Sequence, residues 1–267
     1  MRILPKRKPS VAVIRLNGVI GGGRGLGGAG LSDAALKPVI EAAFRKKPVA
    51  VALAINSPGG SPTQSALIAA RIRRMAAEAE IPVLAFCEDV AASGGYWLAT
   101  AGDEIFADDS SILGSIGVIS AGFGLQELIG RIGVERRMYT AGESKSMLDP
   151  FQPEKPEDLA KMDVMLKAIH ENFIAQVRAR RGARLKEDGL FTGAIFVGQA
   201  AVENGLIDGI GHLEPVMKAR FGDKVKFVEQ KPKRGLLARF GIKGAEAAPE
   251  AMLAALESRA IWARFGL

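Results

Sequence analysis

Two short apolar segments, each followed by a pair of glycines and then by a helical pattern, constrain this chain most. Residues 49–55 (VAVALAI) and 81–87 (IPVLAFC) are the kind of run that forms strands buried on both faces of a sheet. Helical patterns follow at residues 63–79 and 94–100. Strands that alternate with helices predict an α/β fold with a parallel sheet and right-handed crossovers.

Other segments extend this alternation. Strands are predicted at residues 10–16, 104–107 and 134–139, a bent apolar segment at 111–120, and helices at 32–46, 158–181 and 198–205. Pro38 predicts a kink or a restart within the helix at 32–46, because an interior proline removes a backbone hydrogen bond. The long helix at 158–181 carries an apolar stripe typical of a core or a subunit interface.

Ser93 is the candidate nucleophile. It follows the apolar segment 81–87 and precedes Gly94 and Gly95. Open α/β sheets bind ligands at the carboxyl ends of their strands, where a following helix offers unpaired N–H groups. Because glycine lacks a Cβ atom, substrate can come close to this backbone, and the Gly94 N–H can face a developing oxyanion. The alternative is that Ser93 only caps the helix at 94–100.

Two further loops add to this site. The first, Asn-Ser-Pro-Gly-Gly-Ser at 56–61, offers backbone N–H groups of the oxyanion-hole kind; alternatively it is an ordinary turn capped by Ser61 or Thr63. The second is the glycine-containing loop at 140–146, which carries Lys145. A lysine on such a loop is usually a solvated charge, but it is one of few bases available to a serine here.

Four stretches in order, SPGG, DVAASGGYWLATAGDEIFAD, GSIGVI and AGESKSMLDPF, closely resemble the signal peptide peptidase A (SppA, protease IV) family of serine peptidases. The resemblance covers roughly residues 11–213. It implies a ClpP/crotonase-like fold, with a parallel sheet and flanking helices, and a Ser-Lys dyad. The interval between the two candidate residues, 145 − 93 = 52, is similar to the family's spacing.

The resemblance also implies a role for each site residue. By this resemblance Ser93 is the nucleophile and Lys145 the general base. The backbone N–H groups of Gly60 and Gly94 form the oxyanion hole, and Ser144 or Ser146 orients the lysine. The family forms rings, and its tandem-domain members place serine and lysine in different domains. We therefore expect a cyclic homo-oligomer with active sites shared between subunits.

The chemistry of such a dyad is coherent on general grounds. Serine needs a base within hydrogen-bond reach. A lysine serves when desolvation or a nearby cation lowers its pKa from about 10.4, so the site should be covered. His170, in a long helical pattern, and His212, near a helix start, are the alternative bases of a Ser-His-Asp arrangement; we interpret both as solvated or capping residues.

Composition excludes several other classes of function. The 267 residues carry a net charge of +7, but aromatic residues are only 6% and the basic residues are dispersed, which argues against nucleic-acid binding. The charge is compatible with weak peripheral contact with an anionic membrane. No signal peptide, transmembrane segment, metal-ligand spacing or phosphate loop is found, so we expect a cytoplasmic protein without metal or cofactor. The single cysteine, Cys87, excludes an intramolecular disulfide.

The expected organisation is a basic arm at 1–10, a peptidase domain at 11–228 and a basic amphipathic helical tail at 229–267. Residues 18–30, with eight glycines, form a loop that gates the site or acts as a linker. The predicted function is a serine endopeptidase that cleaves unfolded or apolar peptides, signal-peptide remnants included, through an acyl-enzyme. The alternatives are a crotonase-like acyl-CoA enzyme, for which Glu88 and Asp89 are the nearest carboxylates, and a non-catalytic scaffold.

Overall fold

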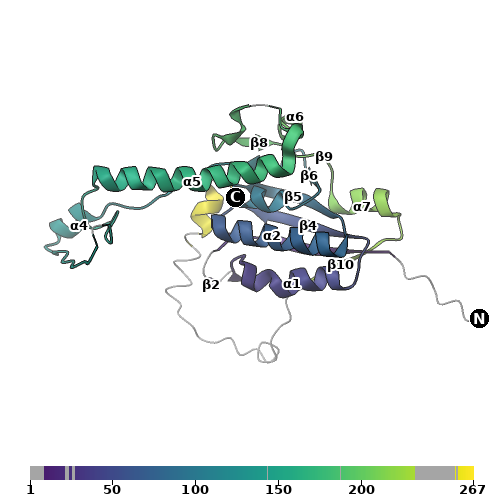
Figure 1. Ribbon diagram of the computed structural model, residues 1–267, viewed down its shortest axis with the longest axis horizontal. Coiled ribbons are helices and arrows are strands. Elements are labelled where there is room, and N and C mark those ends of the chain that lie inside the picture. Colours follow the sequence, from purple (N-terminus) through teal and green to yellow (C-terminus); the bar gives the residue numbers. More distant parts are fainter. Residues whose placement is uncertain are drawn as a thin grey trace, which may run out of the picture. The chain divides into compact units, whose positions relative to one another are not determined.

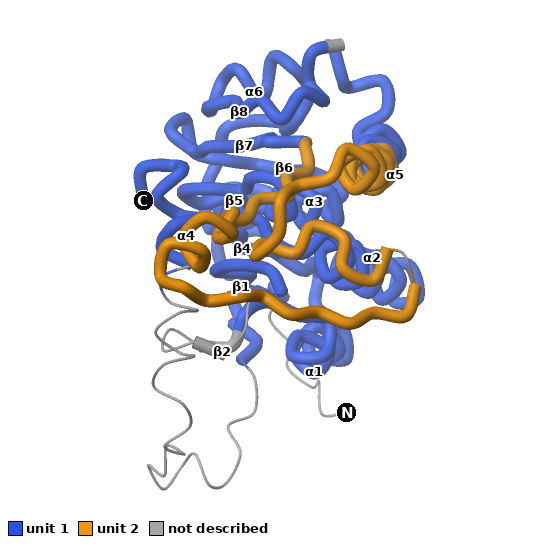
Figure 2. The backbone as a smooth tube through the Cα atoms, turned by 90° about the vertical axis from the view of Figure 1, so that its left-hand side faces the viewer, with its two compact units in different colours: residues 1–116, 173–267 blue, residues 117–172 orange. Residues whose placement is uncertain are grey.

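A computed structural model describes residues 9–21, 24–25, 28–142, 144–186, 188–231, 256 and 258–267. The chain forms two compact units (Figure 2): unit 1 comprises Met1–Ile116 and Phe173–Leu267, and unit 2 comprises Gly117–Asn172. Within the described ranges, no helix is both long and apolar enough to span a bilayer. The predicted domain boundaries and the cellular location stay predictions.

Unit 1 is built on one predominantly parallel sheet. Its strands are β1 (Ser10–Asn17), β4 (Ala50–Ser57), β5 (Val83–Ala92), β6 (Glu104–Ala107), β7 (Ile112–Gly114), β8 (Ile195–Val197), β9 (Gly209–Ile210) and β10 (Lys226–Glu229). Their order is β10-β1-β4-β5-β6-β9, and β7 pairs with β5 and β8. Only the β7–β8 pair is antiparallel in this sheet, while the short strands β2 (Arg24–Gly25) and β3 (Gly28–Ala29) pair separately.

Helices cover both faces of the sheet (Figure 1). The helices of unit 1 are α1 (Asp33–Arg45), α2 (Pro62–Ala79), α3 (Gly94–Ala99), α6 (Gln199–Glu203) and α7 (Leu213–Phe221), with 3-10 turns at Gly182–Arg184 and Asp188–Phe191. Unit 2 contains α4 (Gln126–Arg131). The long helix α5 (Pro156–Arg181) contributes residues to both units.

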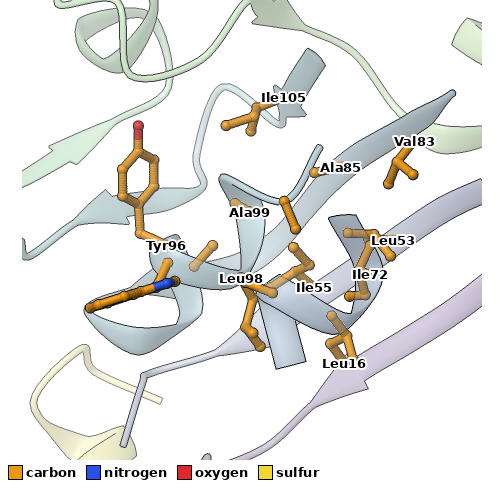
Figure 3. Packing of buried hydrophobic residues seen from close by; sticks show 14 of the residues in the cluster. Leu16, Leu53, Ile55, Ile72, Val83, Ala85, Tyr96, Leu98, Ala99 and Ile105 are labelled. Atoms are coloured by element: carbon orange, nitrogen blue, oxygen red, sulfur yellow. The ribbon is translucent and has the colours of Figure 1, made fainter. Parts of the chain in front are cut away.

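The core follows from the alternation of side chains along the central strands. Along β4, Val51, Leu53 and Ile55 pack with α1, α2 and α3, whereas the alternate positions Ala50, Ala52 and Ala54 face α7. Figure 3 shows the first of these clusters, in which side chains from β1, β4, β5, α2 and α3 meet. Because both faces are covered, the central strands read as continuous apolar runs, as the sequence indicates.

Most of the predicted elements are confirmed, and two details are wrong. Residues 134–139 form no strand: they lie mostly exposed in unit 2, where no described residue forms a strand to pair with them. Helix α1 runs without a break through Pro38, which lies on its exposed side. Of the predicted helical tail at 229–267, residues 232–255 and 257 lie outside the described residues, and residues 258–263 are helical.

A buried ion pair closes the end of α5 onto the sheet within unit 1. The Arg181 side chain is 2% exposed and donates to both carboxylate oxygens of Asp208, at 2.7 and 3.2 Å, and to the Gly205 carbonyl. The same carboxylate accepts the Ile105 N–H of β6 at 2.7 Å. Asp208 therefore joins α5 to the strand that precedes the β6–β7 turn.

We predict that Asp208→Ala lowers the free energy of unfolding by about 3–5 kcal/mol, because it leaves a buried guanidinium unpaired. The matched control is Glu104→Ala. Glu104 pairs with Arg220 at the surface, where both side chains are more than a third exposed, so its loss should cost about 1 kcal/mol or less. Denaturant unfolding of both variants measures the difference, and equal losses would contradict the structural role of Asp208.

Candidate active site

Ser93 occupies a tight turn between β5 and α3. Its φ of 52° and ψ of −123° place a non-glycine residue in a rarely populated region, a strain that surrounding contacts must hold. Its N–H donates to the Gly114 carbonyl at 2.8 Å, and its carbonyl accepts the Trp97 N–H at 3.0 Å. A strained turn between a strand and a helix is the setting in which nucleophile elbows of other folds hold their serine.

The capping alternative for Ser93 is wrong. Ser93 stands at the N-cap position of α3, but its hydroxyl makes no capping hydrogen bond. The side chain is partly exposed and remains available to substrate. Because the Ser93 N–H is already used by Gly114, the next N–H along the chain, that of Gly94, is the nearest unused donor.

Contact between the two glycine-glycine loops forms the centre of the site. A Cβ atom placed on Gly59 would lie 2.8 Å from the Ser93 Cβ and 3.0 Å from the Gly94 nitrogen. A Cβ atom on Gly94 would lie 3.4 Å from the Gly60 nitrogen. The loop after β4 thus packs directly on the Ser93 turn after β5, and the Gly94 backbone lies against the Gly60 nitrogen.

Ile20 supports the first loop from the other side. Its N–H donates to the Gly59 carbonyl at 2.8 Å, and its carbonyl accepts the Ser61 N–H at 2.8 Å. This parallel bridge uses the residues on either side of Gly60 and leaves the Gly60 N–H uncommitted. Within the described residues, neither Gly60 nor Gly94 donates its N–H to the protein, so both can donate to a substrate oxyanion.

Helix α3 anchors the Ser93 turn, and all of its residues are buried. The Tyr96 hydroxyl donates to the Leu206 carbonyl at 2.7 Å, and the Trp97 ring stacks on Phe173 with centroids 4.8 Å apart. Gly95 approaches so closely that a Cβ atom there would collide with the Ser57 carbonyl. The short helix is therefore fixed to the end of β4 and to α5.

Sequence reasoning missed three residues that shape this site. Ser57, at the end of β4, donates to the Gly18 carbonyl at 2.7 Å and accepts the Gly59 N–H at 3.2 Å. Ser65 is buried against Gly94, and Ile20 forms the bridge described above. Ile20 lies beside Val19 in the glycine-rich segment at 18–30, which shows no periodicity that could indicate its pairing.

Lys145 lies in unit 2, whereas Ser93, Gly60 and Gly94 lie in unit 1. The lysine is exposed in a run of turns, where its N–H donates to the Gly142 carbonyl at 3.2 Å. Ser144 accepts a hydrogen bond from Lys161 Nζ of α5 at 2.7 Å. Ser146 makes no side-chain hydrogen bond within the described part of unit 2. The pairing of Ser93 with Lys145 stays a prediction.

Several other ionisable groups of unit 1 line a cavity of about 570 Å³ on the side of the sheet that α7 covers. Its lining includes Glu88, Asp89, Asp108 and His212 but not Ser93. His212 stands at the N-cap position of α7, but its exposed side chain makes no capping hydrogen bond, and its Nε2 atom lies 2.8 Å from an Asp108 oxygen. A backbone hydrogen bond from Ser110, followed by that of His212, lowers the pKa of Asp108.

The two carboxylates considered for acyl-CoA chemistry are already occupied. Glu88 pairs with Arg15 at 2.9 Å, and Asp89 accepts the Asn56 amide at 2.6 Å. Among the described residues, no cluster of histidine, cysteine and carboxylate side chains could hold a metal ion. Burial raises the pKa of Cys87 to about 12, which keeps this thiol neutral and unreactive.

The fold and the site together define a class. A mostly parallel sheet, a serine at positive φ between a strand and a buried helix, and two facing glycine loops are features of the ClpP/crotonase-like α/β fold. Comparison with solved structures agrees. A lysine-to-alanine mutant of the 1510-N membrane-bound stomatin-specific protease, in complex with a substrate peptide, matches 92% of this chain and 98% of its own, with a TM-score of 0.54 and 14% identity.

The serine-to-alanine mutant of the same protease matches 85% of this chain and 100% of its own, with a TM-score of 0.52. At 14% identity these likenesses establish the fold. The model of peptidase family S49 matches residues 75–224. The chain belongs to peptidase family S49, which confirms the predicted SppA resemblance and, at the level of the family, the expectation of a serine peptidase.

Several curated proteins are similar to this chain. The Na(+)/H(+) antiporter NhaA of Brucella melitensis is 47% identical over 285 residues, which cover 100% of this chain and 39% of that protein. The chloroplastic serine protease SPPA of Arabidopsis thaliana is 30% identical, and Protease 4 of Salmonella typhi 31%; each match covers 77% of this chain and about a third of the relative. The chain therefore spans well under half of each relative's length.

The packing of the two glycine loops can be tested at Gly94. A Cβ atom there would lie 2.5 Å from the Ser65 hydroxyl oxygen, so Gly94→Ala should lower the free energy of unfolding by about 1–3 kcal/mol through overpacking. Adding Ser65→Ala removes that oxygen and should restore part of the lost stability. Denaturant unfolding of the two single variants and the double variant measures the coupling; strictly additive losses would contradict the contact.

Proposed function

We propose that this chain is a Ser-Lys endopeptidase in which Ser93 is the nucleophile and Lys145 the general base. The observation that carries the proposal is the contact between the two glycine loops. It sets the uncommitted N–H groups of Gly60 and Gly94 beside the strained Ser93 turn. Two backbone donors beside a serine favour stabilisation of a tetrahedral oxyanion.

The reaction follows from these roles. Neutral Lys145 takes the Ser93 hydroxyl proton as Oγ attacks the peptide carbonyl, and the oxyanion accepts hydrogen bonds from the Gly60 and Gly94 N–H groups. The Lys145 ammonium then gives its proton to the leaving amine, and the C–N bond breaks to leave an acyl-enzyme. Water, deprotonated by Lys145, attacks the ester, and Ser93 regains its proton as the acid product departs.

The proposed substrates are unfolded or apolar peptides, signal-peptide remnants among them. An extended chain can reach a serine at the end of a strand, whereas a folded one presents few such segments. Support comes from the structurally similar stomatin-specific protease, which was solved in complex with a substrate peptide, and from relatives named as proteases. No described feature favours acyl-CoA chemistry, because Glu88 and Asp89 open into a cavity whose lining includes neither Gly60 nor Gly94.

We further propose that the active site is shared between subunits of a cyclic homo-oligomer, with Lys145 of one protomer serving Ser93 of the next. The two residues belong to different units of the chain. Unit 2 also exposes many large apolar side chains, and α4 buries none of its residues. Such surfaces are typical of protein interfaces. The exposed apolar residues include Ile119, Phe123, Leu128, Ile132, Val134, Tyr139, Leu159, Val164 and Met165.

We predict that Ser93→Ala and Lys145→Met each abolish hydrolysis of an unstructured fluorogenic peptide while the fold is retained. The first removes the nucleophile, and the second removes its base. An active-site serine probe should label the wild-type protein and not Ser93→Ala, and circular dichroism should verify folding. Full activity in a folded Ser93→Ala variant would refute the nucleophile, and activity indifferent to Lys145 would refute the dyad.

Sharing of the site predicts complementation between these inactive chains. When Ser93→Ala and Lys145→Met proteins are co-assembled at equal amounts, about a quarter of the interfaces (½ × ½) pair an intact serine with an intact lysine. About a quarter of wild-type activity should therefore return. A dyad within one chain restores nothing, so absence of recovery in verified mixed oligomers would refute sharing and leave the peptidase proposal standing.

A further inference from the structure

The turn that carries Lys145 is fastened to α5 by one side-chain hydrogen bond. Lys161 Nζ, in the second turn of α5, lies 2.7 Å from Ser144 Oγ. Within the described part of residues 142–148, no other side-chain hydrogen bond joins this turn to the helix. Ser144 directly precedes the proposed base, so its position fixes the backbone from which the Lys145 side chain extends.

The rest of this loop is held at other points. Asp149 pairs with Arg136 at 3.3 Å and accepts the Phe151 N–H at 3.0 Å, and the Pro150 carbonyl accepts the Leu125 N–H at 2.6 Å. These contacts fix the residues that follow the base. Among the described residues around Ser144, the bond from Lys161 is therefore the side-chain anchor to α5.

The chemistry of the pair suits a supporting role. An ammonium has three donors and no acceptor, so Ser144 is the acceptor in this bond. The Ser144 hydroxyl keeps its own proton and one lone pair. Once Lys145 has taken a proton from Ser93 it also needs acceptors, and the remaining lone pair of the neighbouring Ser144 can supply one.

We infer that Lys161 is a positioning residue that acts through Ser144 to hold the proposed base; the inference rests on the proposed Ser-Lys dyad. Neither the sequence pattern nor the family resemblance indicated Lys161. A lysine side chain has four rotatable bonds, and misplacement of a catalytic group by about 1 Å can cost on the order of a hundredfold in rate. The Lys161–Ser144 hydrogen bond holds the backbone next to Lys145 and so limits where the Lys145 side chain can extend.

The test compares kcat and KM of wild type with Lys161→Met, Lys161→Arg and Ser144→Ala. We expect Lys161→Met and Ser144→Ala to lower kcat by about tenfold to a hundredfold while KM stays within about twofold. Lys161→Arg, which keeps a donor for Ser144, should retain most of the wild-type kcat. The matched control is Lys167→Met on the same helix, where Lys167 pairs with Asp163; it should behave as wild type.

The double variant Lys161→Met/Ser144→Ala decides whether the two residues act together. Residues of one interaction give a non-additive pair, so the double variant should be no slower than the slower single variant. Additive losses would overturn action through Ser144. Ser144→Ala also keeps the test decisive if Lys161→Met fails to fold, because it removes the acceptor with the smaller change.

The outcomes separate this inference from the proposed function. Wild-type kcat in Lys161→Met, beside an inactive Lys145→Met, would overturn only the positioning role. Loss of all activity in Lys161→Met, without rescue by Lys161→Arg, would show that Lys161 does more than donate to Ser144 and would overturn the inference. Full activity in Lys145→Met would overturn the dyad, and the positioning role with it.

Discussion

The structure of unit 1 depends on a backbone contact that only glycine permits. The loop after β4 and the turn after β5 touch through Gly59, Gly60, Gly94 and Gly95, and a Cβ atom at any of them would press on a neighbouring atom at close range. Parallel strands bring their carboxyl ends to one edge of a sheet, but ordinary side chains would keep these loops apart. Because glycine has no side chain, two backbone N–H groups can lie beside one serine.

Burial of α3 turns this contact into a fixed geometry. A six-residue helix has little stability of its own, and its order comes from tertiary packing. The Tyr96 hydrogen bond, the Trp97–Phe173 stack and the Arg180 hydrogen bond to the Thr100 carbonyl at 2.8 Å hold it at three points. The strain at Ser93 persists because its surroundings are held in this way.

Sequence reasoning predicted the parts of the fold whose signals are local. The β4 and β5 runs, the α2 pattern and the glycine pairs are read directly from the residues, and the structure brings the two glycine loops into contact beside Ser93. The role of Ile20 could not be predicted from the sequence, because its bridge to Gly59 and Ser61 is a long-range pairing without periodicity. The strand predicted at residues 134–139 was wrong because strand propensity does not show whether a partner strand is present.

The placement of Cys87 has a practical consequence. It is the only cysteine among 267 residues, it lies in β5 at 5% exposure, and its thiol is held neutral by burial. In the native fold it is chemically silent toward alkylating reagents, which attack thiolates. Its rate of modification therefore reports opening of the central sheet without any engineered label. A cysteine introduced at an exposed position of unit 2 would be the sole reactive thiol of the folded chain. It would provide a single attachment site for a crosslinker or a fluorophore.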